Sequence, residues 1–487
     1  MRTGSEYRES LRDGRDVWVM GEGPVEDVTT HPATSAMVLE YVKWYDRHFD
    51  PVWEDSLLTY PDNVAECKPL AFEIPTTSAQ LQRQGEAIRA VLFASGGNIT
   101  HTPGYGALIA LGMLNHLKTL DKSSVEIAAA REYQESIAHT GRFLTFAGGG
   151  PLIGPRLRQD PVAIRLDGET DRGIVVSGKV QMHTSTPFAE DVLITSRDEL
   201  PSGSGRWLWF ILPVNSPGVR VVARRTAARH SNPFLSPLSS RFDELDASLW
   251  MKEVFIPRER VFTGERLERT SRHSLVSWLL WHHNCGWLAK AEFTLGIALA
   301  LTEAMGLKEN PVTIQQLVDL AADVQTSRTC IRAAELDPEM TVGGFAVPNQ
   351  LHLAAAAINA FKSRQRMSEI LRGLPGSSLI VAPADTDFAD PTMATELEDG
   401  YGGGGYTALQ RAAVLHLGWD HVASELDARE SVFELHASGG LNAWRAQLRA
   451  WFPSYEELAN GVRQFVEVEL PPMDLTTLKN APYERPR

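Results

Sequence analysis

The sequence contains little cysteine. Its 487 residues include three cysteines, Cys67, Cys285 and Cys330, which lie far apart and are odd in number. A disulfide framework needs cysteines in pairs, so this usage argues against a small secreted scaffold held together by disulfides. It predicts instead a protein of the reducing cytoplasm.

Long apolar runs and an excess of positive charge are also missing. No uninterrupted apolar stretch approaches the roughly 20 residues that span a bilayer. The N-terminal segment is charged and has no apolar signal core. The formal net charge of -14 at pH 7 disfavours nucleic acid and anionic membranes as partners, because binding phosphate requires a basic face. We therefore expect neither partner.

No nucleophile-and-base arrangement or metal-ligand spacing stands out. The glycine run YGGGGY (401–406) lacks the strand–turn–helix context of a phosphate loop and predicts a flexible loop. His282 and His283 are adjacent, and on a helix such neighbours point about 100° apart, which makes them poor joint ligands of one metal. We expect no metal site and favour a packed helix start over acid–base chemistry for this pair.

The sequence does contain two changes of hydrophobic period. Residues 1–150 carry mostly helical spacing after a hairpin-like or irregular entry at 10–32. Residues 151–273 carry short β-rich runs separated by turn signals, which predict an all-β unit. The predicted helices are 35–49, 78–97 and 123–147, and the predicted strands are 161–166, 173–181, 190–196, 206–214 and 218–225.

From residue 274 the helical period returns. Four long amphipathic segments with modest loops predict an antiparallel four-helix bundle over 274–450. These segments are 285–306, 313–336, 351–374 and 407–437. Residues 451–487 contain prolines and predict an irregular tail. The predicted fold class is therefore α+β, with an N-terminal helical domain, a central β-barrel or β-sandwich and a C-terminal bundle.

The most distinctive stretch is 238–263, which contains RFDELDASLWMKEVFIPRERVF. It predicts a buried strand entered from a charged turn and left through a Pro-Arg-Glu-Arg corner. It resembles the end of the β domain in the 4-hydroxyphenylacetate 3-monooxygenase family. The segments TGSEYRESLRDGR, GETDRGIVVSGKVQMHTSTPFAEDVLI and SSLIVAPADTDFADP resemble other parts of that family in the same order. The chain is thereby identified as a member.

The resemblance implies the acyl-CoA dehydrogenase-like fold and a two-component, FAD-dependent monooxygenase. In that family a separate NAD(P)H-flavin reductase supplies FADH2. Oxygen adds at the flavin C4a, and the resulting hydroperoxide delivers one oxygen atom to an aromatic substrate. The cofactor carries the difficult chemistry, so the protein must supply a dry, shaped cavity rather than a catalytic triad. The resemblance also implies a homotetramer assembled through the bundle.

Several positions match flavin contacts of the family. The hydroxyl of Thr184 is expected near the isoalloxazine ring, with Thr186 at the following turn. Ser377 and Ser378 match a loop of small residues that approaches FAD. A guanidinium at Arg429 would suit the pyrophosphate or ribose, although a solvated helix arginine is an open alternative. Pro151 is the proline retained after the substrate motif and is also expected beside the cofactor.

The substrate positions depart from the family pattern. The family holds a phenolic hydroxyl with Arg and Tyr in R-S-P-D-Y and with His in L-T-H-A. Residues 101–105 here are HTPGY, so Tyr105 is kept and His101 stands in place of Arg. Residues 144–147 are LTFA, so Phe146 stands in place of His, beside Thr145. We expect His101 and Tyr105 to be catalytic and Thr145 and Phe146 to line the substrate.

These departures predict an altered substrate. A permanent cation stabilises a phenolate, whereas histidine is a conditional cation. Phe146 adds an apolar face. The pocket therefore favours a larger aromatic, an indole- or pyrrole-like ring, an amine or a carrier-bound substrate over a simple phenol. One alternative stays open, in which the match to the family pattern is shifted by a residue across AGGGP and the catalytic histidine lies elsewhere.

Other reactions on the same fold also stay open. A flavin-dependent oxidase, dehydrogenase or oxidative rearrangement catalyst would need no oxygen insertion. A non-catalytic relic that binds a ligand is disfavoured because Thr184 and the β-domain segment are intact. The 4-hydroxybutyryl-CoA dehydratase branch needs an iron–sulfur cluster, and the first region holds a single cysteine, Cys67.

Overall fold

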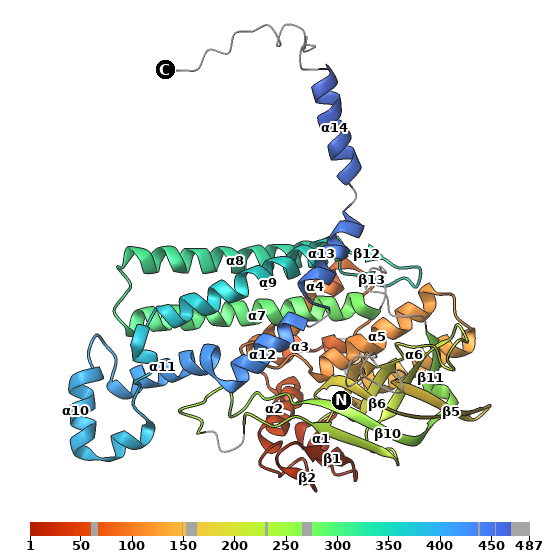
Figure 1. Cartoon of the computed structure of the whole chain (residues 1–487), viewed down its shortest axis with the longest axis horizontal. Coiled ribbons are helices and arrows are strands. Elements are labelled where there is room, and N and C mark those ends of the chain that lie inside the picture. The colour runs from red at the N-terminus through yellow and green to blue at the C-terminus, as the bar shows by residue number, and fades with distance from the viewer. Residues whose placement is uncertain are drawn as a thin grey trace.

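A helical region, a β-rich region and a second helical region follow one another in the computed structural model (Figure 1). The structure describes residues 1–59, 67–148, 150–151, 163–228, 232–264, 275–436, 439–452 and 454–468. The mixed α+β class agrees with the prediction. The domain boundaries stay a prediction, and strands from the first 150 residues join the sheets of the second region.

The first region contains α1 (Gly4–Ser10), α2 (Ser35–Asp46), α3 (Glu54–Leu57), α4 (Ser78–Phe93), α5 (Pro103–Thr119) and α6 (Ser124–Thr140). Helices α2 and α4 confirm two predictions. Helix α5 was not predicted, because all of its residues from Pro103 to Leu117 are buried and its apolar surface runs all round. Its start carries the usual signals: Thr102 caps the helix through its side chain, and Pro103 occupies the first turn.

The helix predicted over 123–147 is wrong beyond residue 140. Helix α6 ends where Gly141 adopts a left-handed conformation with φ 65°. The chain then enters β3 (Leu144–Ala147), which pairs in parallel with β7. As a consequence, Thr145 and Phe146 lie on a strand and point to opposite faces of it.

The strands of the described chain form two main sheets. One has the order β2-β1-β9-β10-β6-β4, with β5 also on β6, and the other has the order β11-β8-β7-β3. The strands are β1 (Asp16–Val19), β2 (Gly23–Val25), β4 (Gly150–Pro151), β5 (Ile164–Thr170), β6 (Gly173–Thr184), β7 (Asp191–Thr195), β8 (Trp207–Pro213), β9 (Val219–Ala223), β10 (Asp246–Pro257) and β11 (Val261–Gly264). Of the five strands predicted between 161 and 225, four are confirmed, and the first is confirmed from residue 164 onward, since residues 161 and 162 lie outside the described residues. Strands β1 and β2 confirm the hairpin-like entry.

The register of β10 against β6 places the site. The two strands are antiparallel, with Asp246 opposite Thr184. The stretch 238–263 therefore brings its acidic turn to the end of β6. Short 3-10 helices also occur at η1 (Arg47–Phe49), η3 (Leu70–Phe72), η5 (Arg258–Arg260), η6 (Gly376–Leu379) and η7 (Asp385–Ala389).

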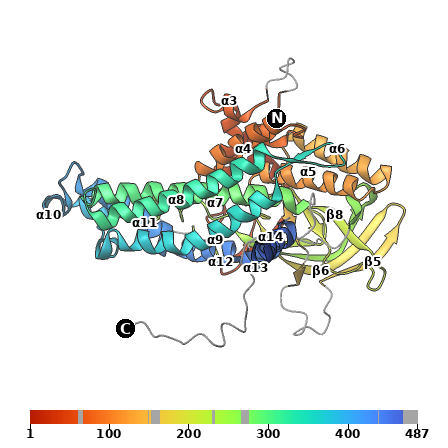
Figure 2. The ribbon, with the colours of Figure 1, turned by 90° about the horizontal axis from the view of Figure 1, so that it is seen from above.

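The second helical region packs around α7 (Leu275–Ala304), which contacts α8 (Pro311–Leu336), α9 (Gln350–Gly373) and α11 (Ala408–Ala423). These long helices run side by side on the opposite side of the molecule from the sheet strands β5, β6 and β8 (Figure 2). The remaining elements are α10 (Pro391–Tyr401), α12 (Glu425–His436), β12 (Glu339–Met340) and β13 (Ala346–Val347).

Two predictions for the C-terminal part need correction. The helix predicted over 407–437 is broken at Ser424, which is extended and whose hydroxyl accepts a hydrogen bond from the backbone N–H of Asp427. The tail predicted to be irregular from 451 is helical in α14 (Tyr455–Val468), which follows α13 (Gly440–Trp451). Helix α14 projects away from the body of the protein (Figure 1).

Among the described residues, α7 alone is long and apolar enough to cross a membrane by length and composition. More than half of its most apolar window is buried inside the protein. Its apolar character is therefore accounted for by its place at the centre of the bundle.

Replacing Gly106 by Ala should destabilise the protein by about 1–3 kcal/mol, the usual cost of overpacking. A Cβ at this position of α5 would lie 2.3 Å from the carbonyl oxygen of Leu144, a backbone atom of β3. The matched control is Gly296→Ala in α7, where nothing lies within 4 Å. It should stabilise by up to about 1 kcal/mol. Urea denaturation of both variants measures the difference, and equal midpoints would contradict this packing.

Candidate active site between the sheets and the bundle

The start of α5 places His101 and Tyr105 together. Thr102 accepts a hydrogen bond from the backbone N–H of Tyr105 at 3.2 Å, which fixes the first turn. His101 precedes the extended N-cap residue Thr102, and its ring folds back onto that of Tyr105, with the two ring centroids 4.7 Å apart. Both side chains are buried. The predicted catalytic pair therefore exists as a contact.

Rings from two other helices enclose this pair. Tyr105 stacks on His283 of α7 with centroids 5.7 Å apart and lies 5.1 Å from His282. The ring of Phe433 on α12 lies 5.7 Å from that of His101. The result is an aromatic cluster built from α5, α7 and α12. Among the described residues it forms no group of three side chains placed to hold a metal ion.

Burial sets the charge of this cluster. Burial lowers the pKa of His283 to about 3 and that of His282 well below its usual value, and the neighbouring imidazoles act in the same direction. Burial, helped by the negative charge of Glu244, raises the pKa of Tyr105 above its usual value. The two α7 imidazoles and the phenol are therefore neutral at physiological pH.

Glu244 is a site residue that the sequence did not single out. Its carboxylate accepts backbone N–H groups from Thr100 at 2.7 Å and from His101 at 2.5 Å. It also accepts the Thr100 hydroxyl at 3.2 Å and lies 3.5 Å from Nδ1 of His101. Glu244 stands in the charged turn before β10, where an acidic residue is usually solvated. The register of β10 against β6 is the signal that could have placed it.

Thr184 and Arg429 meet through Asp246. The Thr184 hydroxyl donates to Oδ1 of Asp246 at 2.8 Å, and Arg429 donates to both carboxylate oxygens at 2.6 and 2.7 Å. Burial alone would raise the pKa of Asp246, but the guanidinium groups of Arg429 and Arg224 hold it below its usual range. Arg429 is buried, so the solvated alternative is wrong.

Some of the other positions predicted near the flavin and the substrate also lie in this part of the protein, and others do not. The hydroxyl of Thr145 donates to the carbonyl of Thr184 at 2.9 Å and so joins β3 of one sheet to β6 of the other. Phe146, on the opposite face of β3, is half-buried. Thr186 is buried, and its hydroxyl donates to the carbonyl of His183. Pro151 lies on β4, paired with Val180 of β6.

Ser377 and Ser378 lie elsewhere. They belong to η6, which packs against α11 and the C-terminal end of α9. Ser377 is exposed. Helix α9 is about 36 Å long at 1.5 Å per residue, and its other end lies near α13 and β13 (Figures 1 and 2). The two serines are therefore not brought to Thr184 within one chain.

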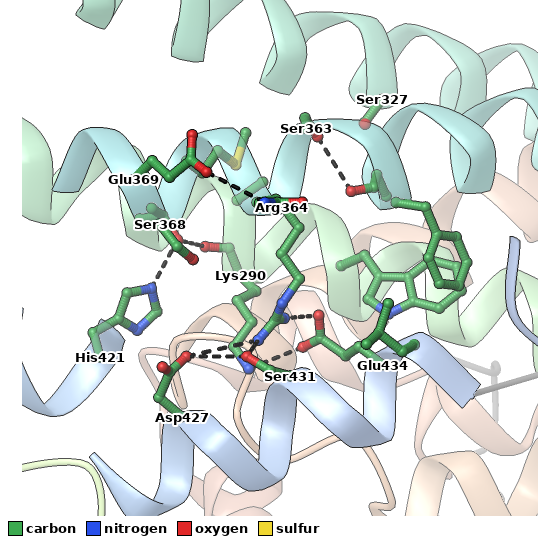
Figure 3. A pocket seen from close by; sticks show the side chains of 18 of the residues that line it. Lys290, Ser327, Ser363, Arg364, Ser368, Glu369, His421, Asp427, Ser431 and Glu434 are labelled. Carbon is green, nitrogen blue, oxygen red and sulfur yellow. Dashed lines mark hydrogen bonds and ion pairs between the residues drawn. The ribbon is translucent and has the colours of Figure 1, made fainter. Parts of the chain in front are cut away.

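A cavity of about 320 Å³ lies inside the bundle (Figure 3). Helices α7, α9 and α12 line it, and His421 of α11 borders it. Trp287 supplies an apolar wall, and its ring lies 6.0 Å from that of His283. Arg364 reaches across the cavity from α9 to Asp427, Ser431 and Glu434 on α12 (Figure 3).

Helix α12 thus has two polar faces. Arg429 points to the sheets, whereas Glu434 points to the cavity. Glu430, between them, pairs with Arg429 and with Lys290 of α7, whose Nζ lies 2.8 Å away. Burial lowers the pKa of Lys290 to about 8, which leaves it protonated at neutral pH. A continuous chain of buried charges therefore links the cavity to the site.

The combination of a helical region, a two-sheet β region and a helical bundle defines a class, the acyl-CoA dehydrogenase-like fold. The structure of an acyl-CoA dehydrogenase from Slackia heliotrinireducens covers 94% of this chain and 98% of that chain, with 15% identity and a TM-score of 0.50. At this identity the likeness concerns the fold alone.

The sequence places the chain in one family, which is a narrower group than the fold class. Residues 3–263 match the family described as 4-hydroxyphenylacetate 3-hydroxylase N terminal, and residues 270–467 match the corresponding C terminal family. The chain belongs to the 4-hydroxyphenylacetate 3-hydroxylase family, as the sequence resemblance predicted.

Individual relatives agree with this assignment. The oxygenase component of a 4-nitrophenol 4-monooxygenase/4-nitrocatechol 2-monooxygenase from Rhodococcus opacus is 28% identical over 465 residues, which cover 89% of this chain and 85% of that protein. The structure of the oxygenase component of 4-hydroxyphenylacetate 3-monooxygenase, complexed with FAD and 4-hydroxyphenylacetate, is 26% identical with a TM-score of 0.88. It covers 96% of this chain and 99% of that chain.

Acidification should weaken the buried network through Glu430. Burial alone would raise the pKa of this carboxyl, but Lys290 and Arg429 lower it to about 2, below the usual 4.5. Its contribution is therefore complete well above pH 4.5 and is lost as the pH falls toward 2. The destabilisation caused by Glu430→Gln should shrink by about 1 kcal/mol between pH 6 and pH 4.

Urea unfolding at both pH values measures this change. Glu369→Gln is the control, because Glu369 is exposed at the mouth of the same cavity. A difference between wild type and Glu430→Gln that stays constant with pH would contradict the ion pairing described for Glu430.

Proposed function

We propose that this protein is the oxygenase component of a two-component monooxygenase. It uses FADH2 and O2 and inserts one oxygen atom, through the flavin C4a-hydroperoxide, into an aromatic or heteroaromatic small molecule other than a simple phenol. Family membership and the FAD-bound relative support the reaction class. The observation that carries the substrate proposal is the replacement of the expected Arg and His by His101 and Phe146 within an otherwise intact site.

The residues present fit FAD. Thr184 and Arg429 bring a hydroxyl and a guanidinium to one buried place at Asp246. The three bonds of Arg429 to Asp246 and Glu430 leave two of its five N–H groups for a pyrophosphate or ribose oxygen. Thr184 and Arg429 would hold the flavin from the sheet side and from α12 respectively. Thr186 and Pro151 flank the same strand end.

Reduced FAD, when bound, supplies the activation of O2. The chain supplies the surroundings: Tyr105 and His101 orient the substrate, Phe146 and Thr145 border it, and the buried cluster excludes water. The hydroxyl of Tyr105 stays protonated because its pKa is raised by burial. It can therefore donate a hydrogen bond to a substrate oxygen or accept one from a substrate N–H.

A simple phenol fits these surroundings less well than it fits the family pattern. The permanent cation nearest to Glu244 among the described residues is Arg429, with Nη1 3.8 Å away. Three of its five N–H groups donate to Asp246 and Glu430. Phe146 presents an apolar phenyl ring where the family pattern has the imidazole of a histidine. A larger or heteroaromatic ring, whose binding does not depend on a permanent cation beside a phenolate oxygen, matches this lining.

Two partners belong to the proposal. A separate NAD(P)H-flavin reductase would deliver FADH2, and the chain would assemble as a homotetramer. Exposed apolar side chains support assembly: Val312, Ile314 and Val318 on α8, and Leu458, Val462 and Phe465 on α14. In such an assembly Ser377 and Ser378, which lie far from Thr184 in their own chain, would approach the FAD of a neighbouring protomer.

The reaction is tested with chemically reduced FAD, O2 and the purified protein. Bound FADH2 should give a C4a-hydroperoxide absorbance that outlives that of free flavin by at least about tenfold, because the site excludes water. Decay at the rate of free flavin would contradict the proposal. Once a substrate turns over, ¹⁸O from O2 should appear in the product. Its absence would favour the oxidase or dehydrogenase alternative.

Tyr105→Phe should lower turnover by about 10²-fold, the usual scale for a group that positions a substrate or transfers its proton. Tyr406→Phe is the control. It also removes one phenolic hydroxyl, which donates to Glu303 on the surface of the bundle. Steady-state kinetics with a separate reductase measure both variants, and similar losses in the two would show that Tyr105 does not face the substrate.

A further inference from the structure

The environment of Nδ1 of His101 contains two oxygen atoms. Oγ1 of Thr100 lies 3.1 Å from Nδ1, and Oε2 of Glu244 lies 3.5 Å from it. These two oxygens are themselves hydrogen bonded at 3.2 Å. All three side chains are buried. Because the three groups share few protons, the donor and acceptor capacity of each group determines the direction of each hydrogen bond.

A carboxylate can only accept hydrogen bonds, and a hydroxyl has one hydrogen to donate. The Thr100 hydroxyl donates that hydrogen to Glu244, since a charged acceptor is the stronger one. Toward His101 it is then an acceptor. Both oxygens facing Nδ1 are therefore acceptors, and Nδ1 must carry the proton. In the neutral ring, Nε2 is left with a free lone pair.

Glu244 is held firmly in this arrangement. Its Oε1 accepts the backbone N–H groups of Thr100 and His101, and the carbonyl of the same residue accepts the N–H of Ser185 at 3.1 Å. The turn before β10 is thus bonded to the residues before α5 through the side chain of Glu244, and to the turn after β6 through its main chain. A carboxylate fixed in this way can fix the imidazole in turn.

Apart from Glu244, the titratable groups around His101 are either neutral or paired with other residues. Tyr105 of α5 and His282 and His283 of α7 are neutral for the reasons given above. On α12, Phe433 is uncharged, and Arg429 is paired with Asp246 and Glu430.

We propose that Thr100 and Glu244 are positioning residues that hold His101 as its Nδ1–H tautomer, so that Nε2 accepts a proton from an O–H or N–H group of the aromatic substrate. This inference rests on the proposed function, since it concerns the same site. In the step, the substrate O–H or N–H bond breaks, its electron pair stays on the substrate, and a new Nε2–H bond forms. The imidazolium so made is stabilised by Glu244.

The proposal narrows the substrate class. The substrate must carry an O–H or N–H conjugated with its ring, so that loss of the proton makes the ring more electron-rich. It binds neutral, and the cation that stabilises its anion is created by the transfer itself. A permanent guanidinium would instead favour a substrate that is already ionised. The histidine at 101 therefore selects less acidic substrates.

The tautomer is measured on the full-length, ligand-free protein. Histidine-specific ¹⁵N labelling with solid-state NMR separates protonated from bare ring nitrogens. The signals of His101 are assigned by their loss in His101→Gln, which is needed because the chain has 14 histidines. Wild type should show protonated Nδ1 and bare Nε2. The opposite pattern would overturn the proposal.

Three variants test the role of Glu244 in setting the tautomer of His101. In Glu244→Gln the amide can donate to Thr100, whose hydroxyl is then free to donate to Nδ1, so more than half of the His101 population should change to the Nε2–H tautomer. Glu244→Asp keeps the carboxylate and should keep the wild-type tautomer. Glu253→Gln, an exposed carboxylate on β10, is the control and should also leave it unchanged. An unchanged tautomer in a folded Glu244→Gln protein would remove Glu244 from this role, as would a changed one in Glu244→Asp.

Proton acceptance is tested with 4-nitrophenol as a probe, without flavin or turnover. Its anion absorbs separately from the neutral form. In buffer near neutral pH, wild type saturated with the probe should produce at least about fivefold more anion than His101→Gln. No anion beyond that of free probe, at concentrations where the probe is shown to be bound, would overturn the proton transfer. Because neither measurement uses FAD, a protein that passes both but forms no oxygenated product would contradict the proposed function and leave this inference standing.

Discussion

The site depends on one buried ion pair, between Arg429 on α12 and Asp246 on β10. These residues are 183 positions apart in the chain. A buried charge is tolerated only when it is paired and hydrogen bonded, and removing one partner of such a pair typically costs about 3–5 kcal/mol. The pair therefore fixes where α12 sits against the sheets. Thr184 joins through the same carboxylate, so three separate elements share one anchor.

Much of the fold could be predicted because its elements follow the periodicities that burial on one face requires. The strands between 161 and 225 and helices α2, α4, α8 and α9 are of this kind. Helix α5 could not be found in this way, because burial on every side leaves no polar stripe. The strand β3 was missed because its pairing with β7 outweighed a local helical pattern. The break at Ser424 was missed because this residue is extended and its hydroxyl accepts the N–H of Asp427 in the next helix.

The site was predictable to the extent that its residues are neighbours in sequence. His101 and Tyr105 are separated by three residues around the N-cap of α5, and this closeness in sequence keeps their rings within contact. Glu244 was missed because its role depends on a strand register that no local pattern specifies. The bundle cavity was missed for a similar reason, since its charges come from separate helices (Figure 3). Arg429 was singled out by resemblance, and its burial became evident only from the packing of α12.

The two-sided nature of α12 has a consequence for the connection that precedes it. An α-helix turns about 100° per residue. Only one rotation of α12 about its axis therefore points Arg429 at β10 and Glu434 at the cavity at the same time. Adding or deleting one residue at the break near Ser424 would rotate Arg429 away from β10 and carry the cavity-facing side chains with it. The length of this short connection is therefore under as strict a constraint as the identity of the charged residues. Natural variation in this protein should therefore accumulate at positions of α12 that face neither the sheets nor the cavity, rather than as changes in the length of the connection at Ser424.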